Sequence, residues 1–238
     1  MSDRGNTAEN LLLQHIPVAV RKALRAEVVE CRVTEKLFSG DETPEFTYFP
    51  DRGAVVSVVR STADGAAVEA GVVSSEGLIS LHNLIVEPGP TGSEGIVQSS
   101  GTFVRIPVAG TRAHFQNDAR FRDAVLAFTS SFLQQVTQNS VCNRLHQIEQ
   151  RLAKWLLLVR ERVPSDELQL THEFMAHMLG IHRPGVSIAV QELELDGLIA
   201  HGRNRIRIVN REGLQKKACE CFPQIHANLR DLRASLAP

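Results

Sequence analysis

The sequence predicts an α+β chain in three parts: a β-rich N-terminal domain, one long helix, and a C-terminal winged helix-turn-helix. Between Phe38 and Pro107, short β-rich runs alternate with glycine, proline and serine. After Gly110, such turn signals cease for some fifty residues, which favours helix. From Leu170 to Ile199, the stretch "LTHEFMAHMLGIHRPGVSIAVQELELDGLI" contains two short amphipathic segments with a glycine between them.

The composition is that of a chain with a well-packed core and no membrane span. Of its 238 residues, 43% are hydrophobic and 22% are charged. No apolar run approaches the roughly 20 residues that cross a bilayer, and the start "MSDRGNTAEN" has no apolar signal region. We therefore expect a cytoplasmic protein. We do not expect an enzyme, because no nucleophile, base and acid set or metal-binding motif is evident.

The four cysteines are few and scattered, which argues against a disulfide framework. They are Cys31, Cys142, Cys219 and Cys221, and only the last two are close in sequence. Thiolate metal sites and iron–sulfur clusters usually show clustered pairs of cysteines. We therefore predict ordinary free thiols, no metal site and no cofactor.

The N-terminal half begins with helix and continues as many short strands. Residues 8–30 have a helical pattern that Pro17 interrupts. Within "AVVSVVRSTADGAAVEAGVV", the pair Asp64-Gly65 predicts the turn of a hairpin, because both residues tolerate positive φ. Many short strands with frequent turns predict a sandwich or a barrel.

The long helix has an aromatic face. Phe121, Val125, Phe128, Phe132 and Val136 recur at steps of four, three, four and four. Two interpretations fit this pattern: a helix that packs on its own β-domain, or a coiled-coil-like helix that joins two copies of the chain. We adopt the second, in which the first four of these residues are the dimerisation contacts.

The helix-turn-helix is predicted from residues with special backbone roles. Thr171 can cap the first helix through its hydroxyl. Gly180 can take the left-handed turn that ends it, and Pro184 suits the first turn of the next helix. The second helix, residues 183–195, keeps Val186 and its apolar neighbours inward and leaves its other face for the DNA major groove.

The wing is predicted from the stretch "GLIAHGRNRIRIVN", which forms two strands around a turn at Gly202–Asn204. Four arginines and no acidic residue lie between Leu198 and Arg211. A local basic stripe on a chain of net charge −1 attracts phosphate.

These elements, in this order, resemble the Crp–Fnr (catabolite-activator) family of bacterial transcription regulators. The winged helix carries most of the resemblance, together with "KLFSGDETPEFTYFPDRGAVVSVV", "VCNRLHQIEQRLAKWLLLVRERV" and "ACECF". The resemblance implies a β-roll sensor domain of the cyclic-nucleotide-binding type over residues 1–115, a dimerisation helix over 116–142 and a DNA-binding domain over 143–238. It also implies a homodimer, an inverted repeat in double-stranded DNA, and RNA polymerase as partners.

In this family the recognition helix opens with a Ser/Arg-type pair, then an acidic residue and later a second Arg. Arg183 matches the first Arg, which can pair bidentately with guanine. Pro184 stands in the place of the acid and Ile188 in that of the second Arg, so the usual family operator is not expected. The predicted DNA-contacting residues are Thr171, His182, Arg183, Ser187, Gln191, His201, Arg203 and Arg205. The alternative is a ligand-binding regulatory module whose winged helix contacts protein.

The sensor departs from the nucleotide-binding members of the family. Their phosphate cassette has Gly-Glu followed by Arg-Ser or Arg-Thr, whereas here Glu76-Gly77 and Glu94-Gly95 have the reverse order. No arginine lies between Arg60 and Arg105, so a buried phosphate would lack a compensating cation. We therefore predict that cyclic AMP is not the effector.

The family includes two other kinds of sensor. The oxygen-sensing branch holds an iron–sulfur cluster with several N-terminal cysteines, and only Cys31 lies in this half. The haem-sensing branch uses a histidine of the β-roll, and His82 is roughly placed for that role, although a lone histidine is more often structural.

Overall fold

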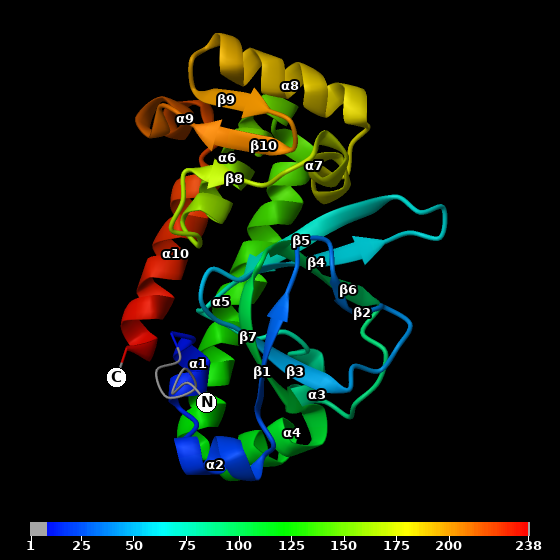
Figure 1. Cartoon of the computed structure of the whole chain (residues 1–238), viewed down its shortest axis with the longest axis vertical. Helices are drawn as coiled ribbons and strands as arrows, with labels where there is room; N and C mark the ends of the chain where they lie inside the picture. Colours follow the sequence, from blue (N-terminus) through cyan, green and yellow to red (C-terminus); the bar gives the residue numbers. More distant parts are fainter. Residues whose placement is uncertain (1–8, 238) are drawn as a thin grey trace.

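The computed structural model describes residues 9–237. The β-rich domain lies at one end and the helix-turn-helix at the other, and the long helices α5 and α10 run between them (Figure 1). Before the sheets come α1 (Leu11–Gln14) and α2 (Val18–Ala23), which Pro17 separates as predicted. The predicted helical pattern is wrong from Glu27 to residue 30, where the chain forms the first strand. None of the helices in the described part of the chain is both long and apolar enough to cross a membrane.

The β-rich domain consists of two antiparallel sheets with a shared core. One sheet has the order β1-β7-β3 and the other β2-β6-β4-β5. Phe49 and Phe103 of the first sheet and Val56 and Val97 of the second are fully buried in one cluster. The strands are β1 (Glu27–Cys31), β2 (Lys36–Phe38), β3 (Phe46–Pro50), β4 (Val55–Ser61), β5 (Ala67–Val73), β6 (Ser93–Ser99) and β7 (Gly101–Pro107). Helix α3 (His82–Ile85) joins β5 to β6, and α4 (Val108–Asn117) follows β7.

The predicted hairpin at Asp64-Gly65 is confirmed. Ser61 at the end of β4 pairs with Ala67 at the start of β5, and Gly65 has φ 84°.

Helix α5 (Ala119–Leu145) is the predicted long helix, but its aromatic face packs on its own domain. Asp118 begins it by accepting a hydrogen bond from the amide of Phe121 at 2.8 Å. Phe121, Val125 and Phe128 are at most 3% exposed and belong to the core of the β-rich domain. A Cβ atom at Gly77 would lie 2.2 Å from the ring of Phe128, which explains the glycine there.

The structure therefore contradicts the assignment of Phe121, Val125 and Phe128 to a dimer interface, and it leaves the predicted role of Phe132 untested. The first three are enclosed by the chain's own sheets, and Phe132 packs partly against the same core. A helical period shows which face is apolar, and it does not show what covers that face.

The C-terminal domain has the predicted order of helices and strands. It comprises α6 (Ile148–Arg160), β8 (Glu167–Leu168), α7 (His172–Leu179), α8 (Arg183–Leu195), β9 (Ile199–Gly202), β10 (Arg205–Ile208) and α9 (Arg211–Lys217). The turn of the wing lies at Arg203 and Asn204, as predicted, and Asn204 has φ 59°.

Helix α10 (Cys221–Leu236) was not predicted from the sequence. It runs back beside α5 towards the β-rich domain (Figure 1). Asn228 Nδ2 donates to the carbonyl oxygen of Ser131 in α5 at 3.0 Å, and Ile225 and Leu229 are buried. The cysteines were predicted to be scattered, but three of them meet where this helix begins.

Three of the four thiols lie together. Cys142, Cys219 and Cys221 form a separate buried cluster, while Cys31 is buried in the β-rich domain. All four are free of disulfide bonds. Residues 77 positions apart in the sequence meet because α10 starts where α5 ends.

The two domains share a core rather than merely touching. Val55 and Val72 of the four-stranded sheet belong to the same buried cluster as Leu152 of α6. Trp155 Nε1 donates a hydrogen bond to Glu69 of β5 at 3.1 Å, and Glu69 also accepts one from Ser57 Oγ at 2.6 Å. The position of the helix-turn-helix is therefore set by its packing on the sensor sheet.

Candidate nucleic-acid interface

The turn between α7 and α8 has the predicted geometry. Thr171 Oγ1 accepts a hydrogen bond from the amide of Phe174 at 3.0 Å and so caps α7. Gly180 ends the helix with φ 63° and ψ 41°, a left-handed conformation that other residues adopt at a cost. Ala176 and Val186 are buried where the two helices meet, so a small side chain permits the close approach.

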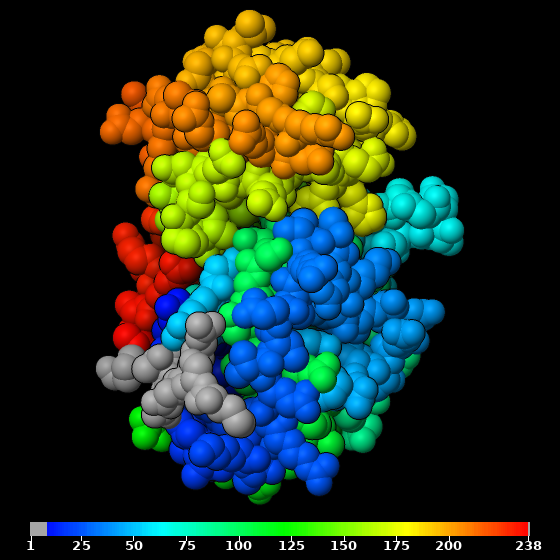
Figure 2. Space-filling model, viewed as in Figure 1, coloured from blue at the N-terminus to red at the C-terminus, as the bar shows by residue number. Residues whose placement is uncertain are grey.

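Helix α8 has one buried face and one exposed face. Val186, Ala189, Val190 and Leu193 are fully buried. Arg183, Pro184, Ile188 and Gln191 are exposed on the other side. Helix α8 lies along the outer edge of the molecule, at the end far from the β-rich domain, and residues of α7, α8 and the wing cover this end (Figures 1 and 2). An exposed helix in this position can enter a major groove about 12 Å wide.

Three predicted DNA-contacting residues meet at one end of α8. Thr171, Arg183 and Arg205 line the same surface hollow, which has a volume of about 310 Å³. They come from the start of α7, the start of α8 and strand β10. His182 precedes α8 as its exposed N-cap residue.

Ser187 is less available than predicted, because a histidine that the sequence analysis missed holds it. Its hydroxyl lies 3.0 Å from His172 Nδ1 and donates to the carbonyl oxygen of Arg183 at 3.2 Å. Burial, and then the charges of His201 and Arg183, lower the pKa of His172, which favours the neutral imidazole. The only sequence feature that could have pointed to His172 is its position directly after Thr171, the residue predicted to cap α7.

Arg203 is the wing residue best placed to meet a phosphate. It is exposed at the tip of the hairpin and forms no ion pair with any residue that the structure describes. By contrast, His201 Nδ1 lies 2.6 Å from Glu194 Oε2, and Arg205 Nη1 lies 3.8 Å from Glu167 Oε1. Among the predicted wing residues, Arg203 is therefore more available to bind a phosphate than His201 and Arg205, which lie near carboxylates of the protein.

A second apolar strip lies on the exposed side of α5. Leu126, Leu133, Val141 and Leu145 are 45%, 64%, 43% and 70% exposed. Their spacing of seven, eight and four residues places them on a side of α5 away from its buried aromatic face, and Leu133, at the edge of this strip, also lines an apolar cavity of the sensor domain. Several large apolar side chains exposed along one helix indicate a contact surface.

The sensor domain contains an apolar cavity of about 410 Å³ between the four-stranded sheet, α3 and α5. Phe38, Val58, Leu78 and Phe132 are among its lining residues, and His82 is the only ionisable one among them. No lysine or arginine of the described chain lines it. The cavity thus lacks a cation for a buried phosphate.

The glutamates that superficially suggest a phosphate cassette are both engaged elsewhere. Arg162 Nε lies 2.8 Å from Glu76 Oε1, and Lys36 Nζ lies 2.6 Å from Glu94 Oε2. Neither glutamate lines the cavity.

We expect cyclic AMP to leave the melting temperature unchanged even at millimolar concentration, because ligand binding stabilises a protein by mass action. Differential scanning fluorimetry, with a known cyclic-AMP-binding regulator as the positive control, measures this. A saturable upward shift for this chain would contradict the interpretation of the cavity.

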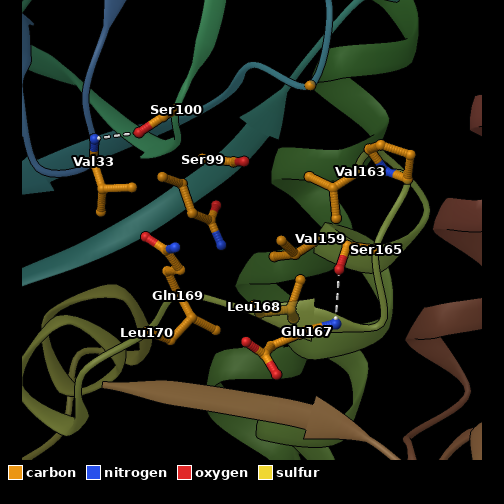
Figure 3. A pocket seen from close by; sticks show the side chains of 13 residues that line it. Val33, Ser99, Ser100, Val159, Val163, Ser165, Glu167, Leu168, Gln169 and Leu170 are labelled. Carbon is orange, nitrogen blue, oxygen red and sulfur yellow. Dashed lines mark hydrogen bonds between the residues drawn. The ribbon is translucent and has the colours of Figure 1, made fainter. Parts of the chain in front are cut away.

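Another cavity, of about 430 Å³, lies where the linker to α7 passes the sensor sheets (Figure 3). The amide of Val33 donates to Ser100 Oγ, and the amide of Glu167 donates to Ser165 Oγ, both at 3.0 Å. Glu167 is the only ionisable lining residue, so this cavity does not suit an anion.

Comparison with known proteins identifies the segment from α6 to α9. The Crp-like helix-turn-helix domain family matches residues 150–217, from α6 to the end of α9. The chain carries a Crp-like helix-turn-helix domain. A Crp-like domain is that of a DNA-binding transcription regulator, as the resemblance implied, and not that of an enzyme.

Over about four fifths of the chain, the fold is that of solved Crp/Fnr regulators. FixK2 from Bradyrhizobium japonicum is 19% identical with a TM-score of 0.67, over 82% of this chain and 98% of that one. A Crp/Fnr-family transcriptional regulator from Thermus thermophilus is 19% identical with a TM-score of 0.65, over 81% and 98%. The c-di-GMP-responsive regulator CLP from Xanthomonas campestris is 16% identical with a TM-score of 0.65, over 81% and 99%. A search of curated proteins found no match. At these identities the similarity concerns the fold of the sensor and of the Crp-like domain together.

Proposed function

We propose that the protein is a homodimeric, cytoplasmic transcription regulator that binds an inverted repeat with α8 in the major groove. The observation that carries this proposal is the exposed face of α8, whose first residue, Arg183, shares a hollow with Thr171 and Arg205. RNA polymerase is the expected protein partner of the bound dimer. Two recognition helices about 34 Å apart would place the half-sites one helical turn apart.

Each exposed residue has a proposed role in reading the DNA. Arg183 pairs with O6 and N7 of a guanine, which is the commonest specific contact of arginine. Ile188, which is 56% exposed on the same face, suits apolar contact with a thymine methyl group. Arg203 contacts phosphate, since its charge is not neutralised within the described protein.

The exposed strip of α5 is the proposed dimer interface, in place of the buried aromatic face. Leu133→Glu should give monomers, because the glutamate would place unpaired charges on both sides of the two-fold axis. Light scattering coupled to size-exclusion chromatography measures the mass. Leu195→Glu, at a residue that is 87% exposed on α8, is the matched control and should remain dimeric. A dimeric Leu133→Glu protein would place the interface elsewhere.

The test of the function is selection of bound sequences from random DNA. We expect an inverted repeat with half-sites about ten base pairs apart and a guanine in each half. Binding to the selected sequence, measured by fluorescence anisotropy, should weaken steeply with salt because cations are released from phosphates. Selection without enrichment, or affinity that salt does not change, would favour the alternative of a winged helix that binds protein.

A further inference from the structure

A compact cluster of metal-ligating side chains lies outside the proposed DNA interface. It comprises Cys142, His146, Cys219 and Cys221, and their ligand atoms all lie within 4.8 Å of one another. Cys142 and His146 are one helical turn apart at the end of α5, and the other two stand at the start of α10. The three cysteines are at most 2% exposed, and the side chain of His146 is 13% exposed.

We propose that these four residues bind one Zn²⁺ ion as a closed structural site. Zinc–sulfur bonds of about 2.3 Å and zinc–nitrogen bonds of about 2.0–2.1 Å give tetrahedral edges of about 3.8 Å between two sulfurs and about 3.5 Å between sulfur and nitrogen. Here Cys142 Sγ lies 3.6 Å from Cys219 Sγ, and Cys221 Sγ lies 3.5 Å from His146 Nδ1. Three thiolates and one imidazole are a known ligand set of structural zinc.

The surroundings orient the ligands as a zinc site requires. His146 Nε2 lies 3.0 Å from Glu220 Oε1, so its proton can be donated to that carboxylate while Nδ1 keeps its lone pair for the metal. Gln138 Nε2 donates to Cys221 Sγ at 3.1 Å. Such outer hydrogen bonds fix the tautomer of the histidine and favour the thiolate form of cysteine.

Two buried cations, Lys154 and Arg151, lie beside the cluster and are opposite to it in the sign of their charge. Zn²⁺ with three thiolates and a neutral imidazole carries a net charge of −1. Lys154 and Arg151 are 5% and 7% exposed, and neither forms an ion pair with a carboxylate in residues 9–237. Buried cations need compensating negative charge, which a thiolate site supplies.

The geometry favours zinc over two other uses of cysteine. A disulfide needs sulfur atoms about 2.05 Å apart, whereas Cys142 Sγ and Cys219 Sγ are separated by 3.6 Å. An iron–sulfur cluster places several irons and sulfides between its ligands and therefore needs more widely spaced thiolates than these. One metal ion would fasten the start of α10 to the junction of α5 and α6.

Metal analysis of untagged protein by inductively coupled plasma mass spectrometry tests the proposal. We expect about one zinc per chain, retained in the Cys31→Ser control because that thiol lies in the β-rich domain. Cys142→Ser and Cys221→Ser should lose the zinc. Cobalt added to chelator-treated wild-type protein should give tetrahedral ligand-field bands with thiolate charge transfer, a readout that does not depend on any variant folding.

Several results would overturn the zinc site. The first is folded wild-type protein that contains no zinc, and the second is protein that contains copper or iron instead of zinc. The others are full zinc content in Cys142→Ser and a cobalt spectrum without thiolate charge transfer. A Cys142–Cys219 disulfide in protein purified without oxygen would do the same.

Discussion

Replacing Glu76 with alanine should lower the free energy of unfolding by about 3–5 kcal/mol, because it leaves a buried arginine without its counter-charge. Glu76 follows β5 in the sensor domain, and its side chain is 3% exposed. Arg162 Nε, from a side chain that is 1% exposed beyond the end of α6, lies 2.8 Å from it, and Arg233 Nη2 of α10 lies 3.4 Å away. Urea denaturation followed by the fluorescence of Trp155, the only tryptophan, measures the change.

The effect of Glu76 should depend on pH. Burial alone would raise the pKa of Glu76, but the charges of Arg162 and then Arg233 outweigh burial and hold it below its usual value. A depressed folded-state pKa stabilises the protein above the unfolded pKa of about 4.3, and this contribution is lost as the pH falls through the folded pKa. The difference between wild type and Glu76→Gln should therefore shrink in acid.

The control for Glu76 is an exposed ion pair. Glu87, whose side chain is 87% exposed, lies 2.8 Å from Arg112 Nη2, and Glu87→Ala should cost at most about 1 kcal/mol. Equal losses in Glu76→Ala and Glu87→Ala would show that the buried pair does not hold the two domains together.

Replacing Arg183 with alanine should cost about 1–3 kcal/mol per half-site and remove the preference for one base pair in each. Over two half-sites this is roughly a 30-fold loss of affinity or more. Arg203→Ala should instead weaken all sequences alike and lower the salt slope by roughly one per phosphate contact. Fluorescence anisotropy with the selected site and a scrambled site, at several salt concentrations, separates the two effects.

One assay thus distinguishes Arg183→Ala, which should lose base preference, from Arg203→Ala, which should keep it and bind all sequences more weakly. Arg25→Ala, an exposed arginine near the N-terminus, is the control and should bind both sequences as wild type does. If Arg183→Ala kept its base preference and Arg203→Ala lost it, the roles of α8 and the wing would be reversed.

Local sequence was sufficient for the elements whose geometry neighbouring residues decide. Thr171 and Gly180 bound α7 as predicted, and Gly65 and Asn204 lie in the two predicted hairpin turns with positive φ. Each of these signals acts through a cap or a backbone conformation a few residues away. The hairpin turn in the sensor and the succession of elements in the winged helix could therefore be predicted without tertiary information, whereas the pairing of the sensor strands was not predicted.

The candidate site was predicted in part. Thr171, Arg183 and Arg205 do meet at one hollow, because the helix-turn-helix and its wing are built from contiguous segments. The contact of His172 with Ser187 was missed, since it depends on how α7 packs against α8. The aromatic face of α5 was correctly found to be apolar, but the partner assigned to it was wrong.

By itself, the sequence determined the winged helix-turn-helix, the long helix and the turns, because periodicity and backbone preference act over a few residues. Only the tertiary structure decided what covers each apolar face and which distant charges and thiols meet. Glu76 reaches Arg162 and Arg233 across 86 and 157 residues, and Cys142 reaches Cys219 across 77. The contacts of Arg233 and Cys219 depend on the return of α10 along α5, and that of Arg162 depends on the packing of α6 against the sensor sheet. No local sequence pattern encodes either arrangement.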